Sequence, residues 1–481
     1  MMVKRKLFLI LCLLPWVAEA QVELSLEDCI LLARSQSTEA KRAEYALKDA
    51  EFEYKLYRKS MLPQLSLSGS IPAFNRTISK LTMPDGSEAF VAQSTGNYSA
   101  NLSLNQVIPF TGGNLYVTSG LQRLDVYMDK TTTSYLANMM NIGLTQPLIA
   151  YNTYKWQRKI EPVAYQKAKR TYVEALENTA LETIGKFYAM LETQQRLLLK
   201  RQNKANSDTL LAIAEEKRAL GKITEDELMD VQISNLNLVV EIRELEIELE
   251  HNRSTLLQHL GLSDTTSITL TIPEPVKVPS IDSEHALSEA VSNGTLELEH
   301  QRRLLEAQSE VARVRANNGF SVNLNGSFGL SKSGGTIGAA YSNPLNQEQI
   351  TLTFTIPILE WGAAKCRRQQ AEAALESEAL AIEQEKRDFN EELRDNVRLY
   401  NLQAAQLDMM IRAIALSEKR YEMCRERYIT GKISFLEFNN AQLEKDNAQI
   451  SYLQTLQKNW QRYYQIRKLT LFDYETGKKV E

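Results

Sequence analysis

The segment KRALGKITEDE, residues 217–227, recurs 210 positions later as RYITGKISFLE, residues 427–437. Both copies hold a basic residue, then glycine-lysine-isoleucine, and then an acidic residue six positions after the glycine. Glycine tolerates the left-handed backbone that tight turns require, and it also fits a simple helix C-cap. The recurrence predicts two equivalent breaks between helices, and hence a chain built from two homologous halves.

Two further matches extend the repeat. Residues 144–148 (LTQPL) correspond to residues 354–358 (FTIPI) at the same separation. Residues 65–70 (LSLSGS) correspond to residues 322–327 (VNLNGS) at a separation of 257, so the first half holds 47 additional residues before Pro147. The expected boundaries are 21–272 for the first repeat, 273–282 for a proline-rich linker and 283–481 for the second repeat.

Each half is expected to follow the same order: a helix, strands, a long helix, the glycine break and a second long helix. Apolar residues recur three or four positions apart over long stretches that hold few glycines or prolines, which is typical of helices. Sixty helical residues reach about 90 Å, so these helices must pack lengthwise as coiled coils. The expected helices are 25–60 and 284–317, with long pairs at 155–219 and 225–260 and at 363–429 and 434–470.

The strands are expected within 64–149 and 320–357. Val322, Leu324 and Phe328 alternate there with Asn323 and Asn325. This pattern is typical of a barrel wall between lipid and water, although a soluble sandwich produces the same alternation. The polar segments 72–96 and 126–138 are expected to be external loops. The extra run 97–124 leaves open whether each chain contributes four or six strands.

The N-terminus has the pattern of a secretory signal peptide over residues 1–20. Three basic residues, Lys4 to Lys6, precede a short apolar core and the small-residue site Ala18-Glu19-Ala20. No other apolar run approaches the roughly 18 residues of a spanning helix. An exported chain of this kind that enters a membrane is therefore expected to do so as a closed barrel.

The sequence offers little for chemistry. None of its four histidines lies at a spacing typical of metal ligands. We therefore predict no catalytic residue, no cofactor and no metal, and we expect a protein that is not an enzyme. The formal net charge of −4 argues against binding nucleic acid, which favours basic patches.

The doubled breaks, the proline-ended strands and the order of elements resemble the TolC-like family of outer membrane efflux proteins. The resemblance implies an α+β membrane protein with a two-fold internal repeat, in which a trimeric outer-membrane β-barrel continues as a long α-helical coiled-coil tunnel in the periplasm. It implies a passive exit duct of a tripartite efflux or type I secretion system. The implied partners are a homotrimer, a periplasmic adaptor, an inner-membrane transporter and outer-membrane lipid.

The alternative function is a periplasmic coiled-coil adaptor or scaffold. Such a protein would explain the long helices but not the paired alternating strands. The transported cargo and the class of pump cannot be read from these residues.

The resemblance also assigns roles to individual residues. Glu227 and Glu437 match acidic positions around the periplasmic aperture, and Tyr428 matches an aromatic residue near the gate. Asn440 and Ile433 depart from the family at positions that can be acidic and basic, so the closing contacts are expected to differ. Residues expected to form the adaptor-docking turns are Lys217, Gly221, Lys222, Arg427, Gly431 and Lys432, and those expected at the barrel-to-helix transition are Pro147 and Pro357.

Overall fold

The computed structural model describes residues 22–82, 86–127, 130–264, 266–278 and 280–480. The predicted signal peptide lies outside these residues. The chain divides into two compact units. A helical unit comprises the chain through residue 48 together with 168–297 and 386–481, and a sheet unit comprises 49–167 and 298–385.

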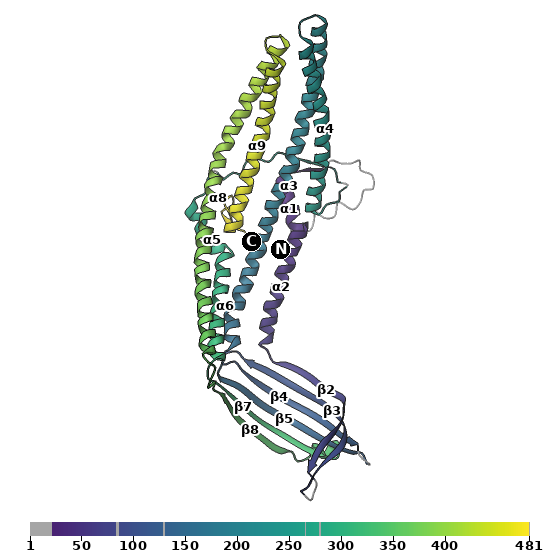
Figure 1. The fold of residues 1–481 in the computed structure, drawn as a ribbon, viewed down its shortest axis with the longest axis vertical. Helices are drawn as coiled ribbons and strands as arrows, with labels where there is room; N and C mark the ends of the chain where they lie inside the picture. Colours follow the sequence, from purple (N-terminus) through teal and green to yellow (C-terminus); the bar gives the residue numbers. More distant parts are fainter. Residues whose placement is uncertain (1–21, 83–85, 128–129, 265, 279, 481) are drawn as a thin grey trace, which may run out of the picture. The chain divides into compact units, whose positions relative to one another are not determined.

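The long helices begin and end close to the predicted positions, because each pair is interrupted only at its glycine break (Figure 1). The single helices expected over 25–60 and 284–317 are each broken in two. Ser37 and Gly294 have extended backbones there, and the Ser37 hydroxyl accepts a hydrogen bond from the Ala40 N–H. The helices are α1 Leu26–Gln36, α2 Thr38–Ser60, α3 Thr153–Ala219, α4 Glu225–Leu260, α5 Ser283–Asn293, α6 Leu296–Asn317, α7 Ile337–Ala340, α8 Ala363–Ile429 and α9 Phe435–Thr470.

The hydrophobic core of the helical unit is formed by the apolar stripes of α1, α3, α4 and α9, which pack against one another. The apolar stripe of α8 is buried at Leu393, Val397 and Tyr400 but exposed at Ile411. Short strands complete the unit: β1 Val22–Leu24 pairs in parallel with β6 Ile268–Leu270, and β9 Phe472–Asp473 pairs with β10 Lys478–Lys479. The 273–282 linker lies along α9, since the Trp460 indole N–H donates to the Glu274 carbonyl at 3.0 Å.

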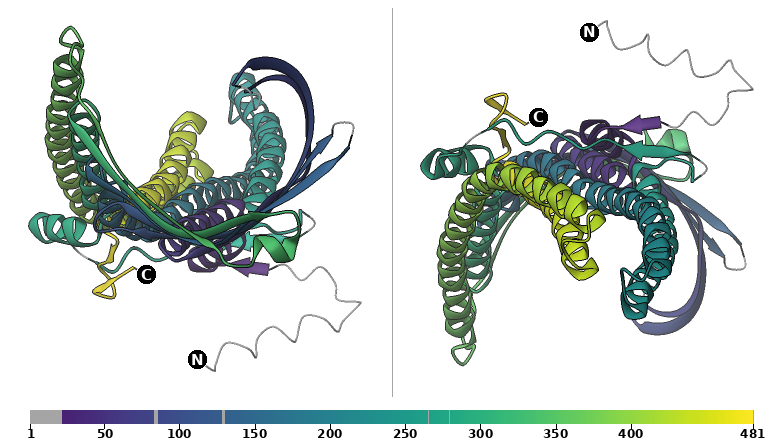
Figure 2. Two further views of the ribbon diagram at one scale, coloured as in Figure 1. Left: turned by 90° about the horizontal axis from the view of Figure 1, so that it is seen from below. Right: turned by 90° about the horizontal axis from the view of Figure 1, so that it is seen from above.

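The sheet unit contains one antiparallel sheet of six strands in the order β2-β3-β4-β5-β7-β8. The run 97–124 is a β-hairpin within this sheet, so the sheet of this chain holds six strands rather than four. Figure 2 shows that the sheet is curved. The strands are β2 Gln64–Thr82, β3 Glu88–Ile108, β4 Gly113–Tyr127, β5 Thr132–Ile149, β7 Ser321–Gly334 and β8 Leu345–Thr355.

The expectation of external loops over 72–96 and 126–138 is wrong for most of these residues. Thr77 pairs with Gln93, and Asp125 pairs with Thr133, in continuous antiparallel registers. These segments are polar because alternate residues of a strand occupy the polar face of the sheet, so polarity alone did not distinguish strand from loop.

The four junctions of α2, α3, α6 and α8 with the sheet lie at one end of its strands, whereas the short α7 lies between β7 and β8 at the other end. Ser321 pairs with Thr355 and Ile149 with Val322, so these strand ends are neighbours. Gln64, at the start of β2, pairs with Asn105 close to the turn that joins β3 to β4. Over the described ranges, no helix is both long enough and apolar enough to span a membrane.

Candidate functional sites on the sheet and at the hairpin tips

The strand registers place apolar side chains on one face of the sheet. Leu67 pairs with Leu102, Val117 with Ile142, and Leu324 with Leu352. Exposure on this face is high at the edges, reaching 75% at Leu67 and 83% at Ile350. The apolar residues of this face are Leu65, Leu67, Leu102, Leu104, Leu115, Val117, Ile142, Leu144, Leu324, Phe328, Leu330, Ile350, Leu352 and Phe354. Polar residues among them are Gln106, Ser119, Gln146, Asn346 and Glu348.

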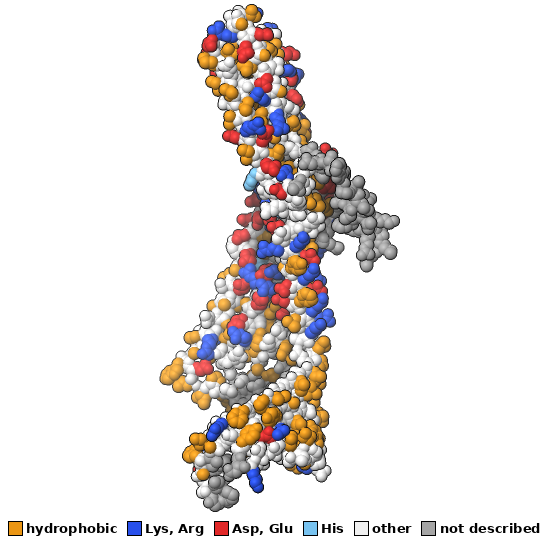
Figure 3. Space-filling model, turned by 90° about the vertical axis from the view of Figure 1, so that its right-hand side faces the viewer, with side chains coloured by type: hydrophobic (Ala, Val, Ile, Leu, Met, Phe, Trp, Pro, Cys, Tyr) orange, Lys and Arg blue, Asp and Glu red, His pale blue; other side chains and the backbone are white. Residues whose placement is uncertain are grey.

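The opposite face carries small polar side chains. The hydroxyls of Ser66 and Ser103 lie 2.8 Å apart on neighbouring strands. This polar face comprises Ser66, Ser68, Asn101, Ser103, Thr118, Asn141, Thr145, Asn323, Asn325, Thr351 and Thr353. Figure 3 shows mainly hydrophobic and uncharged side chains over the sheet on the visible side, with a few charged ones, whereas charged side chains are denser over the helices. The two faces of the sheet therefore differ in polarity.

The two predicted prolines lie where strands lead into helices. Pro147 is part of β5, and the register with β7 shifts between Pro147 and Ile149. Pro357 lies between the end of β8 and the start of α8. Proline cannot donate a ladder hydrogen bond, which suits the end of a strand.

The two glycine breaks have nearly the same backbone. Gly221 and Gly431 have φ values of +68° and +72°, and an added Cβ would meet nothing within 4 Å at either one. The requirement for glycine is therefore conformational rather than steric. Lys222 N–H donates to the Lys217 carbonyl at 2.8 Å, and the Lys432 N–H donates to the Arg427 carbonyl at 2.9 Å. These bonds close the C-termini of α3 and α8.

Lys217 connects the two hairpin tips, namely the turns between α3 and α4 and between α8 and α9. Its Nζ donates to the Ile429 carbonyl at 3.1 Å and to the Tyr428 carbonyl at 3.4 Å. The same ammonium lies 5.5 Å from the centre of the Tyr428 ring. A cation at the end of α8 complements both the exposed carbonyls and the helix dipole.

An aromatic cluster forms the base of the second tip. Tyr428 stacks on Phe438 with ring centres 5.4 Å apart, and Tyr421 and Phe435 contact the same ring. Burial is the larger cause that raises the pKa of the Tyr428 hydroxyl, and the negative charge of Glu227 is the smaller one. Only Tyr428 was predicted from the sequence, although the seven-residue spacing of 421, 428 and 435 was a signal that could have identified the others.

A cavity of about 410 Å³ lies between the two tips. It brings together five of the predicted residues: Lys217, Lys222, Glu227, Tyr428 and Gly431. Of the other predicted tip residues, Gly221, Arg427, Lys432 and Glu437 do not line this cavity.

The two predicted gate carboxylates occupy the third position of their helices. Glu227 forms a capping box, in which its Oε2 accepts from the Thr224 N–H at 3.3 Å and its own N–H donates to the Thr224 hydroxyl at 3.2 Å. The Glu437 N–H donates to the Ser434 hydroxyl at 3.3 Å, while its exposed carboxylate takes no part in the cap. The Glu227 side chain thus stabilises the start of its returning helix, whereas the start of the second returning helix is capped by the Ser434 side chain.

A buried polar pair joins the two hairpins further along the helices. The Asn203 amide on α3 donates to the Asp446 carboxylate on α9 at 2.5 Å. Burial raises the pKa of Asp446, and this hydrogen bond partly offsets that effect. The sequence analysis missed this pair, because a polar residue within an apolar stripe shows no partner in the sequence.

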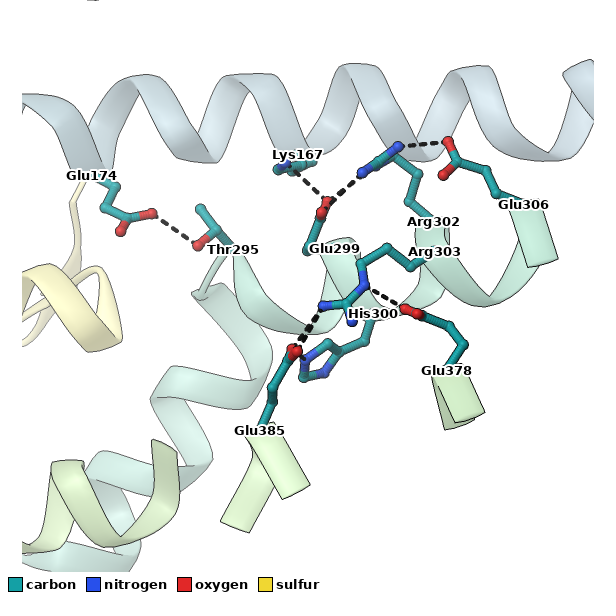
Figure 4. A network of polar contacts seen from close by, with 10 residues as sticks. All are labelled: Lys167, Glu174, Thr295, Glu299, His300, Arg302, Arg303, Glu306, Glu378 and Glu385. Atoms are coloured by element: carbon teal, nitrogen blue, oxygen red, sulfur yellow. Dashed lines mark hydrogen bonds and ion pairs between the residues drawn. The ribbon is translucent and has the colours of Figure 1, made fainter. Parts of the chain in front are cut away.

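Within the sheet unit, charged side chains connect the helices that join the sheet (Figure 4). Arg303 of α6 forms ion pairs with Glu378 and Glu385 of α8. Glu299 of α6 accepts from Arg302 and pairs with Lys167 of α3 at 2.9 Å, which together lower the Glu299 pKa to about 2. In the part of the chain that the structure describes, no group of histidine, cysteine and acidic residues could hold a metal ion.

Residues 295–470 match the family model described as "Outer membrane efflux protein". No curated protein matches the chain. The fold is similar to a membrane protein from Pseudomonas aeruginosa, with TM-score 0.67, 15% identity, and coverage of 92% of this chain and 93% of that one. The CmeC outer membrane channel of Campylobacter jejuni has a TM-score of 0.65 and 14% identity, with coverage of 92% of this chain and 85% of that one. The outer membrane protein VceC of Vibrio cholerae has a TM-score of 0.64 and 13% identity, with coverage of 95% of this chain and 97% of that one. The resemblance to TolC-like outer membrane efflux proteins is thereby confirmed.

Proposed function

We propose that three copies of this chain form an outer-membrane channel that serves as a passive exit duct. Three sheets close into one barrel, and the long helices continue as a tunnel into the periplasm. An inner-membrane transporter and a periplasmic adaptor deliver the cargo, as in tripartite efflux or type I secretion. The energy for transport comes from the transporter.

The observation that carries this proposal is the polarity of the sheet. Its apolar face suits lipid, and its polar face suits a water-filled lumen. The edge strands β2 and β8 have no partner strand on their outer sides within the described residues. Six strands are too few for a barrel of the usual minimum of about eight, so neighbouring chains must supply the rest. β8 of one chain would pair with β2 of the next.

A matched pair of substitutions on β8 tests the proposal. Ile350→Lys places a charge on the apolar face, and Thr351→Lys places the same charge on the polar face; both positions are exposed in the single chain. We expect Ile350→Lys to reduce the urea-resistant trimer in outer membranes severely, whereas Thr351→Lys leaves it near wild type. Lipid-facing charges cost about 2–4 kcal/mol at the bilayer midplane.

Equal tolerance of both substitutions, with the wild-type protein released by urea as a peripheral protein, would favour the adaptor or scaffold alternative. The apolar face of the sheet is the observation against that alternative, since a periplasmic protein would leave it in water.

We propose that the hairpin tips dock the adaptor, through Lys217, Gly221 and Lys222 of the first tip and Arg427, Gly431 and Lys432 of the second. Their common turn backbone and basic flanks support this role. Replacing Gly221 and Gly431 by valine should abolish efflux while trimer levels stay normal. Efflux that persists at the wild-type level would exclude docking at these turns.

We further propose that Glu227 and Glu437, with Tyr428 nearby, surround the periplasmic aperture of the trimer. Threefold repetition would create a ring of carboxylates that favours cations. Trivalent cations should block the wild-type channel in planar bilayers from the periplasmic side, and the double variant Glu227→Ala, Glu437→Ala should lose this block. Block that persists in the double variant would leave both residues as helix caps alone.

A further inference from the structure

The β3–β4 hairpin has no counterpart in the second repeat. The sequence matches pair β2 with β7, and the end of β5 with the end of β8 and the three residues that follow it. β3 and β4 stand between β2 and β5, and they account for the additional residues of the first half. The first repeat therefore contributes four strands to the sheet and the second contributes two.

This hairpin continues both faces of the sheet. On the apolar face, Leu104 of β3 pairs with Leu65 of β2 and with Val117 of β4. On the polar face, Ser103 pairs with Ser66 and Thr118. The hairpin therefore has the residue pattern of the wall itself rather than that of a plug.

The turn of the hairpin is fastened to the strand-to-helix junctions of the sheet unit. The Asn152 amide, just before α3, donates to the carbonyls of Pro109 at 3.2 Å and Phe110 at 3.1 Å. The Gln106 amide donates to the Met61 carbonyl at 2.9 Å, just before β2. These bonds hold the hairpin on both sides along the row of junctions.

We propose that the β3–β4 hairpin widens the exit pore, so that the trimer closes as a barrel of eighteen strands. This inference rests on the proposed channel function. Barrel diameter grows roughly linearly with strand number, so the lumen has about twice the cross-section of a twelve-stranded wall. Barrels of 16–18 strands leave an aqueous channel. The outer portal therefore admits bulky polar solutes and flexible polymers, and it does not act as the size filter of the duct.

The test compares the wild-type barrel with a variant that lacks residues 88–131. This deletion joins Ser87 to Thr132, and β5 can replace β3 beside β2 because both strands run in the same direction. Both proteins carry Cys29→Ala, Cys366→Ser and Cys424→Ser, which removes the free cysteines of the described chain. Thr353→Cys then reports on the polar face, and Leu352→Cys is the matched control on the apolar face.

Maleimide-linked polyethylene glycols of graded size are added to intact cells. We expect Thr353→Cys to react with larger polymers in the wild-type barrel than in the deletion variant, with limiting cross-sections that differ about twofold. The same size limit in both proteins would refute the proposal that the hairpin widens the pore, but it would not contradict the proposed channel function. Reaction at Leu352→Cys as fast as at Thr353→Cys would instead contradict the proposed wall.

Strand counting in the wild-type trimer keeps the inference testable if the deletion variant does not assemble. Electron cryo-microscopy of the full-length protein should show eighteen strands in one closed wall. A wall of twelve strands, with the β3–β4 hairpin outside it or folded into the lumen, would refute the inference.

Discussion

The two hairpin tips share one backbone but differ in the side chains that support it. At equivalent positions, Arg218 and Glu225 form an ion pair at 2.7 Å in the first tip, whereas Tyr428 and Phe435 form a ring contact at 5.9 Å in the second. The first tip is thus stabilised by an exposed ion pair and a capping box, and the second is stabilised by a buried aromatic cluster. The shape of the turn follows from the glycine and the cap alone, which leaves the neighbouring positions able to diverge.

The aromatic support gives the largest expected difference between the tips. Phe438 is 2% exposed, and Phe438→Ala should destabilise the second tip by about 3–5 kcal/mol, since it leaves a cavity. The equivalent change Leu228→Ala removes a half-buried side chain and should cost less than about 2 kcal/mol. Amide hydrogen exchange across both tips of the intact protein measures each loss. If Phe438→Ala and Leu228→Ala reduce the stability of their tips equally, the aromatic cluster adds no stability to the second tip.

The shared backbone predicts equal effects of glycine substitution. Gly221→Ala and Gly431→Ala should each cost about 1–2 kcal/mol, because both positions require positive φ and neither has a steric neighbour. Hydrogen exchange of the last turns of α3 and α8 reports the change. A loss confined to one tip would mean that the two turns are not equivalent in solution.

Asp446 distinguishes the second returning helix from the first, where the equivalent Leu236 is 66% exposed. Because its pKa is raised in the folded protein, the folded state binds its proton more strongly than the unfolded state does. Stability of the α3–α9 contact should therefore fall as pH rises from the ordinary carboxyl range through the raised pKa. The groups around the carboxylate are Asn203, Lys445 and Lys200.

Asp446→Asn should remove this pH dependence while keeping the side chain close to its present shape. Protection factors measured between pH 4 and 7, corrected for intrinsic exchange, compare the two proteins. A wild-type contact whose stability rises with pH over this range would contradict the assigned direction.

The smallest effect is expected for the ion pair of the first tip. The side chains of Arg218 and Glu225 are 44% and 65% exposed, so Arg218→Ala should cost about 0.2–1 kcal/mol at low salt. The loss should fade as salt screens the pair. Tyr428→Ala, the matched change in the second tip, should show no comparable salt dependence. A double-mutant cycle with Arg218→Ala and Glu225→Ala measures the interaction free energy of these two side chains apart from their other contacts.

The sequence predicted the helical framework well because its signals are local. The glycines at 221 and 431 and the residues after them determine where α3 and α8 end, and the long apolar stripes determine the lengths of the helices. The breaks at Ser37 and Gly294 were missed, although Gly294 directly follows Asn293 in a combination that is typical of a helix end. Six strands in one sheet could be established only from the strand pairing, which includes the contact of β5 with β7, whose residues are distant in sequence.

The candidate sites were predicted less completely. Lys217, Lys222, Glu227, Tyr428 and Gly431 meet at one cavity, and their doubled motif was the signal that identified them. Phe435 was missed although it lies seven residues after Tyr428, and Phe438 and the Asn203–Asp446 pair were missed because their contacts depend on which helices pack together. The roles of the predicted residues in gating and docking stay predictions until the channel experiments are done.

The even number of strands constrains how this protein can change over evolutionary time. The helices α2, α3, α6 and α8 all join the sheet at the same end of its strands, so a single added strand would move all the following elements to the opposite end. A paired insertion leaves each later element on its original side. The β3–β4 hairpin is an insertion of this kind, and duplication or loss of whole hairpins is therefore the step by which relatives can vary in width without rebuilding their helices.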